Sequence, residues 1–107
     1  MKKDKWVNKF KNEALPKLIV EFNPQQVLLF GSRIRGKPRK DSDIDIIIIS
    51  DSFESIPFVN RMGLILKKIK FPKHVDYFCY TISEFEKIKN ESCVLIDALE
   101  YAETINF

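Results

Sequence analysis

The sequence has few cysteines and no long apolar run, and each of these absences excludes a class of protein. Cys79 and Cys93 are the only thiols in 107 residues, and their spacing matches neither a metal site nor a redox pair. Two isolated thiols fit a reducing compartment, so we expect a cytoplasmic protein. No apolar run approaches the ~20 residues of a membrane-spanning helix. The charged start MKKDKW also lacks the apolar stretch of a signal peptide, so we expect no association with a membrane.

The chain shows no internal repeat and no low-complexity segment, and nothing in it marks a second domain. We therefore expect residues 1–107 to form one domain, of a size that buries roughly two-thirds of its unfolded surface. Apolar residues make up 45% of the chain and aromatic residues 12%. This composition supplies a core and argues against disorder.

Two short apolar runs flank the most informative segment, LLFGSRIRGKPRKDSDIDIIIIS. The first run, residues 27–30, stops at Gly31 and Ser32, and both runs have the length of strands. Gly31 permits a sharp exit from the first strand and a close approach of a ligand to the backbone. Ser32 can cap a short helix that follows, and the free amides at a helix start favour anions. The segment therefore predicts a phosphate-binding turn.

Two carboxylates open the second apolar run. Asp43 and Asp45 are two residues apart, so on a strand they point to the same face. Adjacent carboxylates repel each other unless a cation lies between them. A solvent-exposed turn explains Asp43 poorly, and it explains Asp45, inside an apolar run, still less. A phosphate cradle beside a divalent-metal site indicates phosphoryl transfer.

Positive and negative charges are also segregated around this segment. Residues 33–40 carry five bases and no acid, and residues 41–54 carry five acids and no base. A basic lobe beside an acidic one suits a metal–triphosphate complex, which offers both charges. The simpler alternative is a solvated turn whose charges balance.

Gly31-Ser32, ten further residues and then Asp43-Ile44-Asp45 resemble the Gly-Ser-x10-Asp-x-Asp motif of the polymerase-beta-like nucleotidyltransferase superfamily. With Arg35-Gly36 and Ser42-Asp43 in place, the short chain is similar to the minimal nucleotidyltransferases. Well-known members are the MntA-like antitoxins of HEPN/MNT toxin–antitoxin pairs. The resemblance runs from about Pro24 to the end of the chain, but only the motif is specific.

This resemblance implies a chemistry for each motif residue. Asp43, Asp45 and Asp76 would be the catalytic carboxylates and would hold two divalent cations, normally Mg²⁺. Gly31 and Ser32 would grip the phosphates of a nucleoside triphosphate, most simply ATP. Carboxylates with no histidine or thiolate nearby also suit magnesium on chemical grounds. The acceptor would be a hydroxyl group of a HEPN-type partner protein.

The expected fold is α/β (α+β), a small mixed three-stranded sheet with helices packed against it. The first two strands should be antiparallel neighbours, because Ser32 and Asp43 must reach one site. The second and third should be parallel, joined by a right-handed helical crossover that brings Asp76 beside Asp45. The strands are expected over residues 26–30, 43–49 and 74–81, and the helices over 5–22 with a kink or break at Pro16, 58–70, 84–89 and from Asn90 onward.

Several local features are expected as well. In the helix over 58–70, an apolar stripe of Phe58, Met62, Ile65 or Leu66, and Ile69 should face the core, and Gly63 should mark close packing on the sheet. Ser83 with Glu86 predicts a capping box, and Asn90 predicts a cap for the last helix. Both cysteines are expected to be buried.

Other side chains leave alternatives open. Asp76 either ligates a metal or pairs with Lys73 or His74. Arg33 and Arg35, and similarly Lys40, either contact phosphate or cover the loop. His74 is expected to be a surface residue rather than a base.

Three functions remain in competition. The first is a magnesium-dependent transfer of a nucleoside monophosphate, AMP from ATP, to a hydroxyl group of a partner protein, as the antitoxin of a HEPN-type toxin. The alternative is a non-catalytic module that neutralises its partner by occlusion. A nucleic-acid-binding domain that uses residues 33–40 is less favoured, because the aromatic residues fall at core spacing and do not interleave with the bases.

Overall fold

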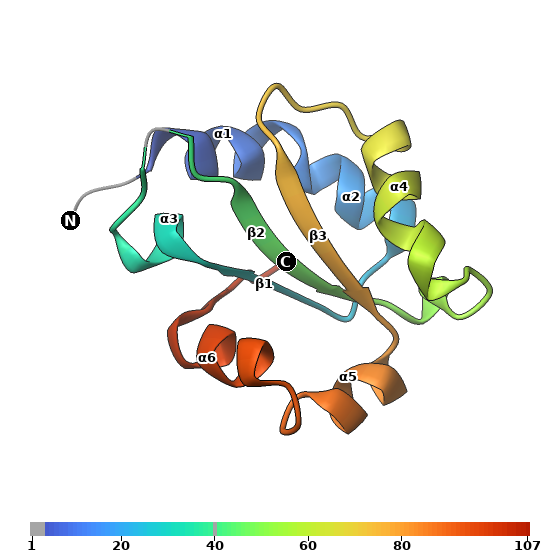
Figure 1. Ribbon diagram of the computed structural model, residues 1–107. Helices are drawn as coiled ribbons and strands as arrows, with labels where there is room; N and C mark the ends of the chain where they lie inside the picture. The colour runs from blue at the N-terminus through green and yellow to red at the C-terminus, as the bar shows by residue number, and fades with distance from the viewer. Residues whose placement is uncertain (1–3, 40) are drawn as a thin grey trace.

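A computed structural model describes residues 4–39 and 41–107, so the two alternatives for Lys40, a phosphate contact or covering the loop, lie outside the described residues. One or two helices precede each strand along the chain (Figure 1). The helices are α1 (Lys5–Glu13), α2 (Leu15–Phe22), α3 (Ser32–Arg35), the 3-10 helix η1 (Asp51–Phe53), α4 (Phe58–Lys68), α5 (Ile82–Ile88) and α6 (Cys93–Tyr101). The strands are β1 (Gln26–Phe30), β2 (Ile44–Ile49), β3 (Val75–Tyr80) and β4 (Glu103–Thr104).

The sheet has the order β3-β2-β1-β4. β1 and β2 are antiparallel and β2 and β3 are parallel, which confirms the predicted topology. The prediction of three strands is one short, because β4 pairs with β1 at the edge of the sheet. Apolar residues continue the helical spacing beyond Tyr101, so the pattern predicted helix there. The backbone instead turns extended at Ala102, and the amide of Ile105 donates to the carbonyl oxygen of Val27.

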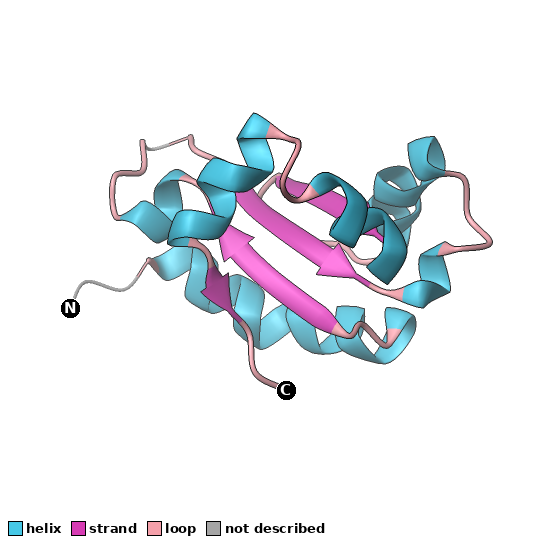
Figure 2. Cartoon of the chain, turned by 90° about the horizontal axis from the view of Figure 1, so that it is seen from below, coloured by secondary structure: helices cyan, strands magenta, loops and turns pink. Residues whose placement is uncertain are grey.

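Helices cover both faces of the sheet (Figures 1 and 2). Side chains of a strand alternate between faces, and in β2 Ile46 and Ile48 join the core cluster that includes Phe10 and Leu18 of α1 and α2. Ile47 packs in a second cluster with Leu95 and other residues of α5 and α6. In the part of the chain that the structure describes, no helix is both long and apolar enough to cross a membrane.

The N-terminal helical segment is broken in two, as its proline predicted. α1 ends at Glu13, and Pro16 is the second residue of α2. A proline is tolerated in the first turn of a helix because the missing amide would have no intrahelical partner there. Asp4 caps α1, with its side chain accepting from the amides of Trp6 and Val7.

The predicted inner face of α4 is confirmed toward its C-terminal end and wrong toward its N-terminal end. Ile65 and the following Ile69 are buried in the core as predicted, but Phe58 and Met62 are 55% and 40% exposed, and Arg61 is buried. Gly63 faces open space, since a Cβ built there meets nothing within 4 Å, so it does not mark close packing. Apolar periodicity does not indicate an arginine at a buried position of the helix.

Three further local predictions are also corrected. The capping box of α5 is formed by Thr81 and Glu84, two residues before the predicted pair. Ser92, and not Asn90, caps α6 through a hydrogen bond from the amide of Leu95. Cys79 is buried as expected, but Cys93 is exposed.

Candidate functional site

The strand register brings two of the predicted site residues side by side. Phe30 of β1 pairs with Asp45 of β2, and Asp45 pairs in turn with Asp76 of β3. Because side chains alternate along a strand, both carboxylates point to the face that α5 and α6 cover further along. Asp43 immediately precedes β2. The sheet itself therefore gathers acids at the start of its two parallel strands.

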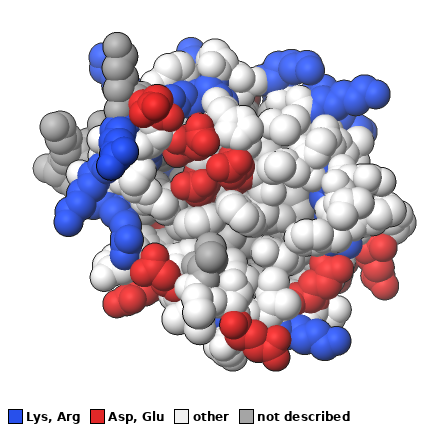
Figure 3. Space-filling model, in the orientation of Figure 1, with Lys and Arg blue, Asp and Glu red and all other residues white. Residues whose placement is uncertain are grey.

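A histidine completes the cluster. Asp43, His74 and Asp76 each offer a ligand atom, and these three atoms lie within 4.8 Å of one another. His74 Nε2 lies 2.9 Å from Asp76 Oδ1. The predicted absence of a histidine from the site is therefore wrong, and the surface pairing between His74 and Asp76 exists within the same cluster. Figure 3 shows acidic side chains gathered over the start of β2 and β3, with basic side chains beside them on the side of α3.

Burial and the charges of neighbouring carboxylates both act on Asp45. Burial raises the pKa of its carboxyl group, and the charges of Asp76 and Asp43 raise it further, to about 6. His74 opposes this shift in part. A carboxylate that is half-buried beside two others is stabilised by a shared proton or by a cation. The cluster thus favours bound positive charge.

Gly31 lies directly against these acids. Its φ is +85°, and a Cβ at this position would lie 2.1 Å from Asp45 Oδ2. Only glycine both adopts this backbone conformation without strain and leaves room for the carboxylate. Gly31 also occupies the cap position of α3, so Ser32 is the first helical residue and not the cap that the sequence predicted. The turn therefore places the start of α3 next to the acidic cluster.

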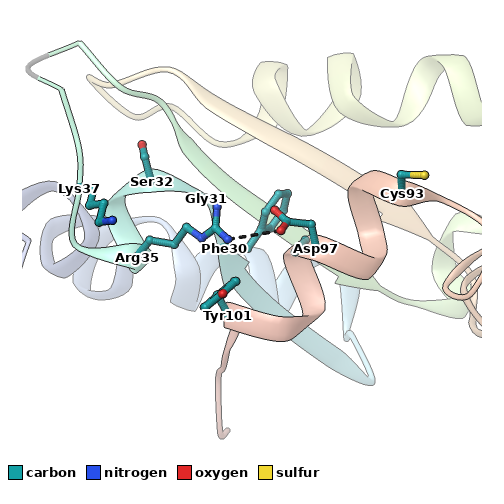
Figure 4. A pocket seen from close by; sticks show the side chains of 9 residues that line it. Phe30, Gly31, Ser32, Arg35, Lys37, Cys93, Asp97 and Tyr101 are labelled. Carbon is teal, nitrogen blue, oxygen red and sulfur yellow. Dashed lines mark hydrogen bonds and ion pairs between the residues drawn. The ribbon is translucent and has the colours of Figure 1, made fainter.

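A hollow of about 520 Å³ borders this turn (Figure 4). Arg35 crosses it: Nη2 donates to Asp97 Oδ1 at 3.3 Å, and the guanidinium lies 4.0 Å from the centre of the Tyr101 ring. The sequence did not indicate Asp97 and Tyr101, because nothing links two positions of α6 to Arg35, which is 62 residues before Asp97. Residues that line the hollow are Phe30, Gly31, Ser32, Arg35, Lys37, Cys93, Asp97, Ala98 and Tyr101.

Arg33 lies in a different place from Arg35. Its side chain is buried, with Nη1 donating to Asp4 Oδ2 at 2.9 Å and Nε to the carbonyl oxygen of Ser42 at 2.7 Å. These contacts tie the start of α1 and the loop before β2 to α3. They favour the loop-covering alternative for Arg33, since a contact with phosphate would have to replace them.

Comparisons with known proteins agree with this geometry. A family model described as a nucleotidyltransferase domain matches residues 8–104. A crystal structure from Sulfolobus solfataricus, of a protein designated a nucleotidyltransferase, is similar to this chain with a TM-score of 0.57 and 28% sequence identity. The match covers 76% of this chain and 72% of that one. No curated protein matches the chain significantly.

Proposed function

Because the chain belongs to the nucleotidyltransferase domain family, of the polymerase-beta-like superfamily, we propose that it transfers AMP from ATP to a hydroxyl group of a partner protein. The observation that carries this proposal is the contact between the Gly31 turn and the acidic cluster. The turn proposed to bind phosphate and the carboxylate proposed to bind metal lie so close that a Cβ on Gly31 would be 2.1 Å from Asp45 Oδ2.

The residues of the cluster fit divalent cations. Carboxylate oxygens are the ligands of Mg²⁺ in proteins, and a bound cation would offset the burial and like charge that raise the pKa of Asp45. Asp43, Asp45 and Asp76 would hold the ions. When bound, two ions neutralise the charge that develops on the attacking and leaving oxygens of an in-line displacement. Asp76, on the edge strand β3, would help accept the proton of an acceptor hydroxyl.

The turn and the hollow supply the phosphate side of the proposed site. Gly31 keeps side-chain atoms away from the backbone, so that a phosphate oxygen approaches the amides at the start of α3. Arg35 and Lys37 line the hollow and provide positive charge for the outer phosphates. Arg35 is shared with Asp97 in the structure, so binding a triphosphate would draw the guanidinium away from that carboxylate. Pyrophosphate would leave from this side.

The proposed identities of the acceptor and of the nucleotide are based on the resemblance of the motif to that of antitoxin nucleotidyltransferases. We propose that the acceptor is a HEPN-type toxin and that adenylylation of one of its hydroxyl groups silences it. No feature of the described residues reads a base, so the choice of ATP is tested directly by comparing the four ribonucleoside triphosphates.

Intact mass spectrometry tests the proposal. The protein is incubated with the product of the adjacent gene, tested as the HEPN-type partner, together with Mg²⁺ and each nucleoside triphosphate in turn. The expected result is a gain of one or more AMP units on the partner with ATP. Asp45→Asn should abolish the gain, whereas Asp41→Asn, the same change at an exposed acid of the preceding loop, should preserve it. Tight binding of the partner without any mass gain would contradict transfer and favour occlusion.

A further inference from the structure

His74 is the single histidine of the chain, and it lies inside the acidic cluster. Its backbone is fixed there, because the amide of Ile44 donates to the carbonyl oxygen of His74 at 3.3 Å, in line with the parallel ladder of β2 and β3. Its position two residues before Asp76 places both side chains on one side of the strand end. The imidazole therefore faces the acids as a consequence of the fold.

We infer that His74 is a metal ligand, and that the cluster therefore prefers Mn²⁺, a first-row transition ion, to Mg²⁺. The inference rests on the proposed function in that it concerns the ion of the same site. An imidazole nitrogen is a softer donor than a carboxylate oxygen, and Mg²⁺ selects oxygen ligands. A set of carboxylates with one imidazole suits an ion that accepts both, and Mn²⁺ is hard enough for the carboxylates.

The spacing of the donor atoms fits one ion. Neighbouring ligands of an octahedral ion with bonds of about 2.1 Å lie about 3 Å apart, and His74 Nε2 lies 2.9 Å from Asp76 Oδ1. This contact is a hydrogen bond in the metal-free protein, so an ion held by both atoms would displace the proton between them. Asp43 completes a group that spans 4.8 Å, which is slightly wider than an octahedron allows. His74 is exposed and Asp43 and Asp76 are partly exposed, so small side-chain rotations close this difference.

The competing explanation is a surface ion pair between His74 and Asp76. Such a pair contributes about 0–1 kcal/mol to stability and has no preference among metals. Replacing His74 would then leave the selectivity for metals unchanged. The ratio of Mn²⁺ to Mg²⁺ affinity, rather than either affinity alone, distinguishes the two explanations, because the carboxylates bind both ions.

Electron paramagnetic resonance of Mn²⁺ tests the inference on the untagged protein without nucleotide. Electron spin-echo modulation should show coupling of the bound ion to ¹⁴N, and this coupling should vanish in His74→Asn, since the chain has no other histidine. Titration with Mn²⁺, and displacement by Mg²⁺, gives the affinity ratio. Even a supporting residue costs about 10–100-fold in metal affinity when it is lost, so His74→Asn should weaken Mn²⁺ at least tenfold and Mg²⁺ much less.

Two further variants sharpen the result. His74→Asp restores a full set of ligands, all of them oxygen, and should bind Mg²⁺ more tightly than His74→Asn while keeping a low Mn²⁺ to Mg²⁺ ratio. Asp41→Asn, an exposed acid outside the cluster, should leave the ratio unchanged. Absence of nitrogen coupling in the wild-type protein, absence of Mn²⁺ binding, or an unchanged ratio in His74→Asn would each overturn the inference.

The outcomes separate this inference from the proposed function. Nitrogen coupling without any nucleotide transfer would keep His74 as a ligand and remove the enzymatic role. Nucleotide transfer with a ratio of Mn²⁺ to Mg²⁺ affinity that does not change in His74→Asn would keep the enzymatic role and remove His74 as a ligand.

Discussion

Charged side chains are arranged differently at the two ends of the parallel strands β2 and β3. We call the end where both strands begin, beside the acidic cluster, the near end, and the end where both strands finish the far end. At the far end, the buried guanidinium of Arg61 meets the carboxylate of Glu84 with two hydrogen bonds, one of 3.1 Å, and also donates to the carbonyl oxygens of Ile56 and Cys79. At the near end, Asp45 lies between two other carboxylates and has its pKa raised to about 6. One end of the sheet thus lies beside an ion pair of opposite charges between α4 and α5, and the other end holds a cluster of carboxylates that repel one another.

The far end holds residues that stabilise the fold, and the near end holds residues that lower its stability. Each of the three guanidinium nitrogens of Arg61 donates a hydrogen bond, as a buried charge requires. The acids of the near end oppose folding unless something positive binds them. A group of side chains that costs stability and is held by the strand register identifies the site more firmly than a hollow does. The following variants test whether the two ends differ in this way.

The largest effect is expected for transfer activity at the near end. Asp45→Asn removes a metal-binding oxygen and keeps the size of the side chain. Metal stabilisation of the developing charge is worth several kcal/mol, and about 1.4 kcal/mol is a factor of ten in rate. We expect turnover to fall about a thousandfold or more, measured as AMP transferred to the partner, while the melting temperature without metal is kept or rises. Near-normal turnover would remove Asp45 from the catalytic site.

The next largest effect is a loss of stability at the far end. Glu84→Gln keeps the acceptor for the amide of Thr81 but leaves the buried charge of Arg61 without its counterion. Arg61 is buried, but the side chain of Glu84 is 39% exposed, so solvent screens part of the lost interaction and we expect a cost of about 1–3 kcal/mol. Denaturant unfolding should show this loss, whereas Glu86→Gln, which breaks only an exposed pair with Lys89 on the same helix, should change stability by less than about 1 kcal/mol.

The pH dependence of the same pair gives a second readout. The hydrogen bond from Arg61 holds the pKa of Glu84 below its usual value of 4.5. A lowered pKa in the folded state contributes stability above the ordinary pKa, and this contribution is lost as the pH falls below it. Acidification should therefore destabilise the wild-type protein more than Glu84→Gln. Equal acid sensitivity would mean that the pair does not contribute.

A third comparison uses the three glycines. Gly31→Ala places a Cβ against Asp45 and forces a backbone conformation at φ +85° that costs about 1–3 kcal/mol for other residues. Gly36→Ala, at φ +80° with open space around it, carries the backbone strain without the collision. Gly63→Ala, inside α4 and also in open space, should stabilise by about 0.5–1 kcal/mol.

Thermal melting and transfer rates together isolate the contact with Asp45. Gly31→Ala should lose more stability than Gly36→Ala and should also lose transfer. If the two variants behaved alike, the close approach of the turn to the carboxylate would not matter.

The sequence predicted the near end well because its signals are local. β1 was predicted with its observed bounds, since an apolar run stops at Gly31, and the pairing of β2 with β3 followed from the helical crossover between them. The two-residue separation that placed Asp43 beside Asp45 also applies to His74 and Asp76, so the histidine was within reach of the same reasoning. His74 is exposed, as a lone histidine is expected to be, and exposure by itself gives no signal that the imidazole binds a metal.

Contacts between distant segments were beyond local reasoning. Arg35 meets Asp97 and Tyr101 only because α6 returns to the edge of the sheet before β4. Arg61 occupies a core position that hydrophobic periodicity assigns to an apolar residue, and its partner Glu84 was expected inside a helix with a different cap. A two-residue edge strand such as β4 carries no periodicity at all.

The smallest expected effect concerns the stability of the metal-free protein, and it probes the near end most directly. Burial comes first among the causes that raise the pKa of Asp45, and the charge of Asp76 comes second. Because the folded-state pKa of about 6 lies above the ordinary value of 3.8, the folded protein binds more protons than the unfolded chain between these values. The contribution of Asp45 to the stability of the metal-free protein should therefore fall as the pH rises from about 4 to about 6, opposite in sign to the contribution of Glu84.

Asp76→Asn should flatten this dependence, because it removes one of the two neighbouring charges and leaves the burial. It also removes the pairing with His74, which as an exposed contact is worth about 0–1 kcal/mol. At neutral pH the relief of repulsion offsets that loss, so the melting temperature without metal should be kept or should rise slightly. The stabilisation that Mg²⁺ or Mn²⁺ gives should shrink, because ligand linkage depends on the affinity of the intact cluster. Asp41→Asn should change neither the pH profile nor the metal effect. If Asp76→Asn lowered the melting temperature at pH 7 and kept its full response to metal, Asp76 would be a structural partner of His74, and the two ends of the sheet would not differ in kind.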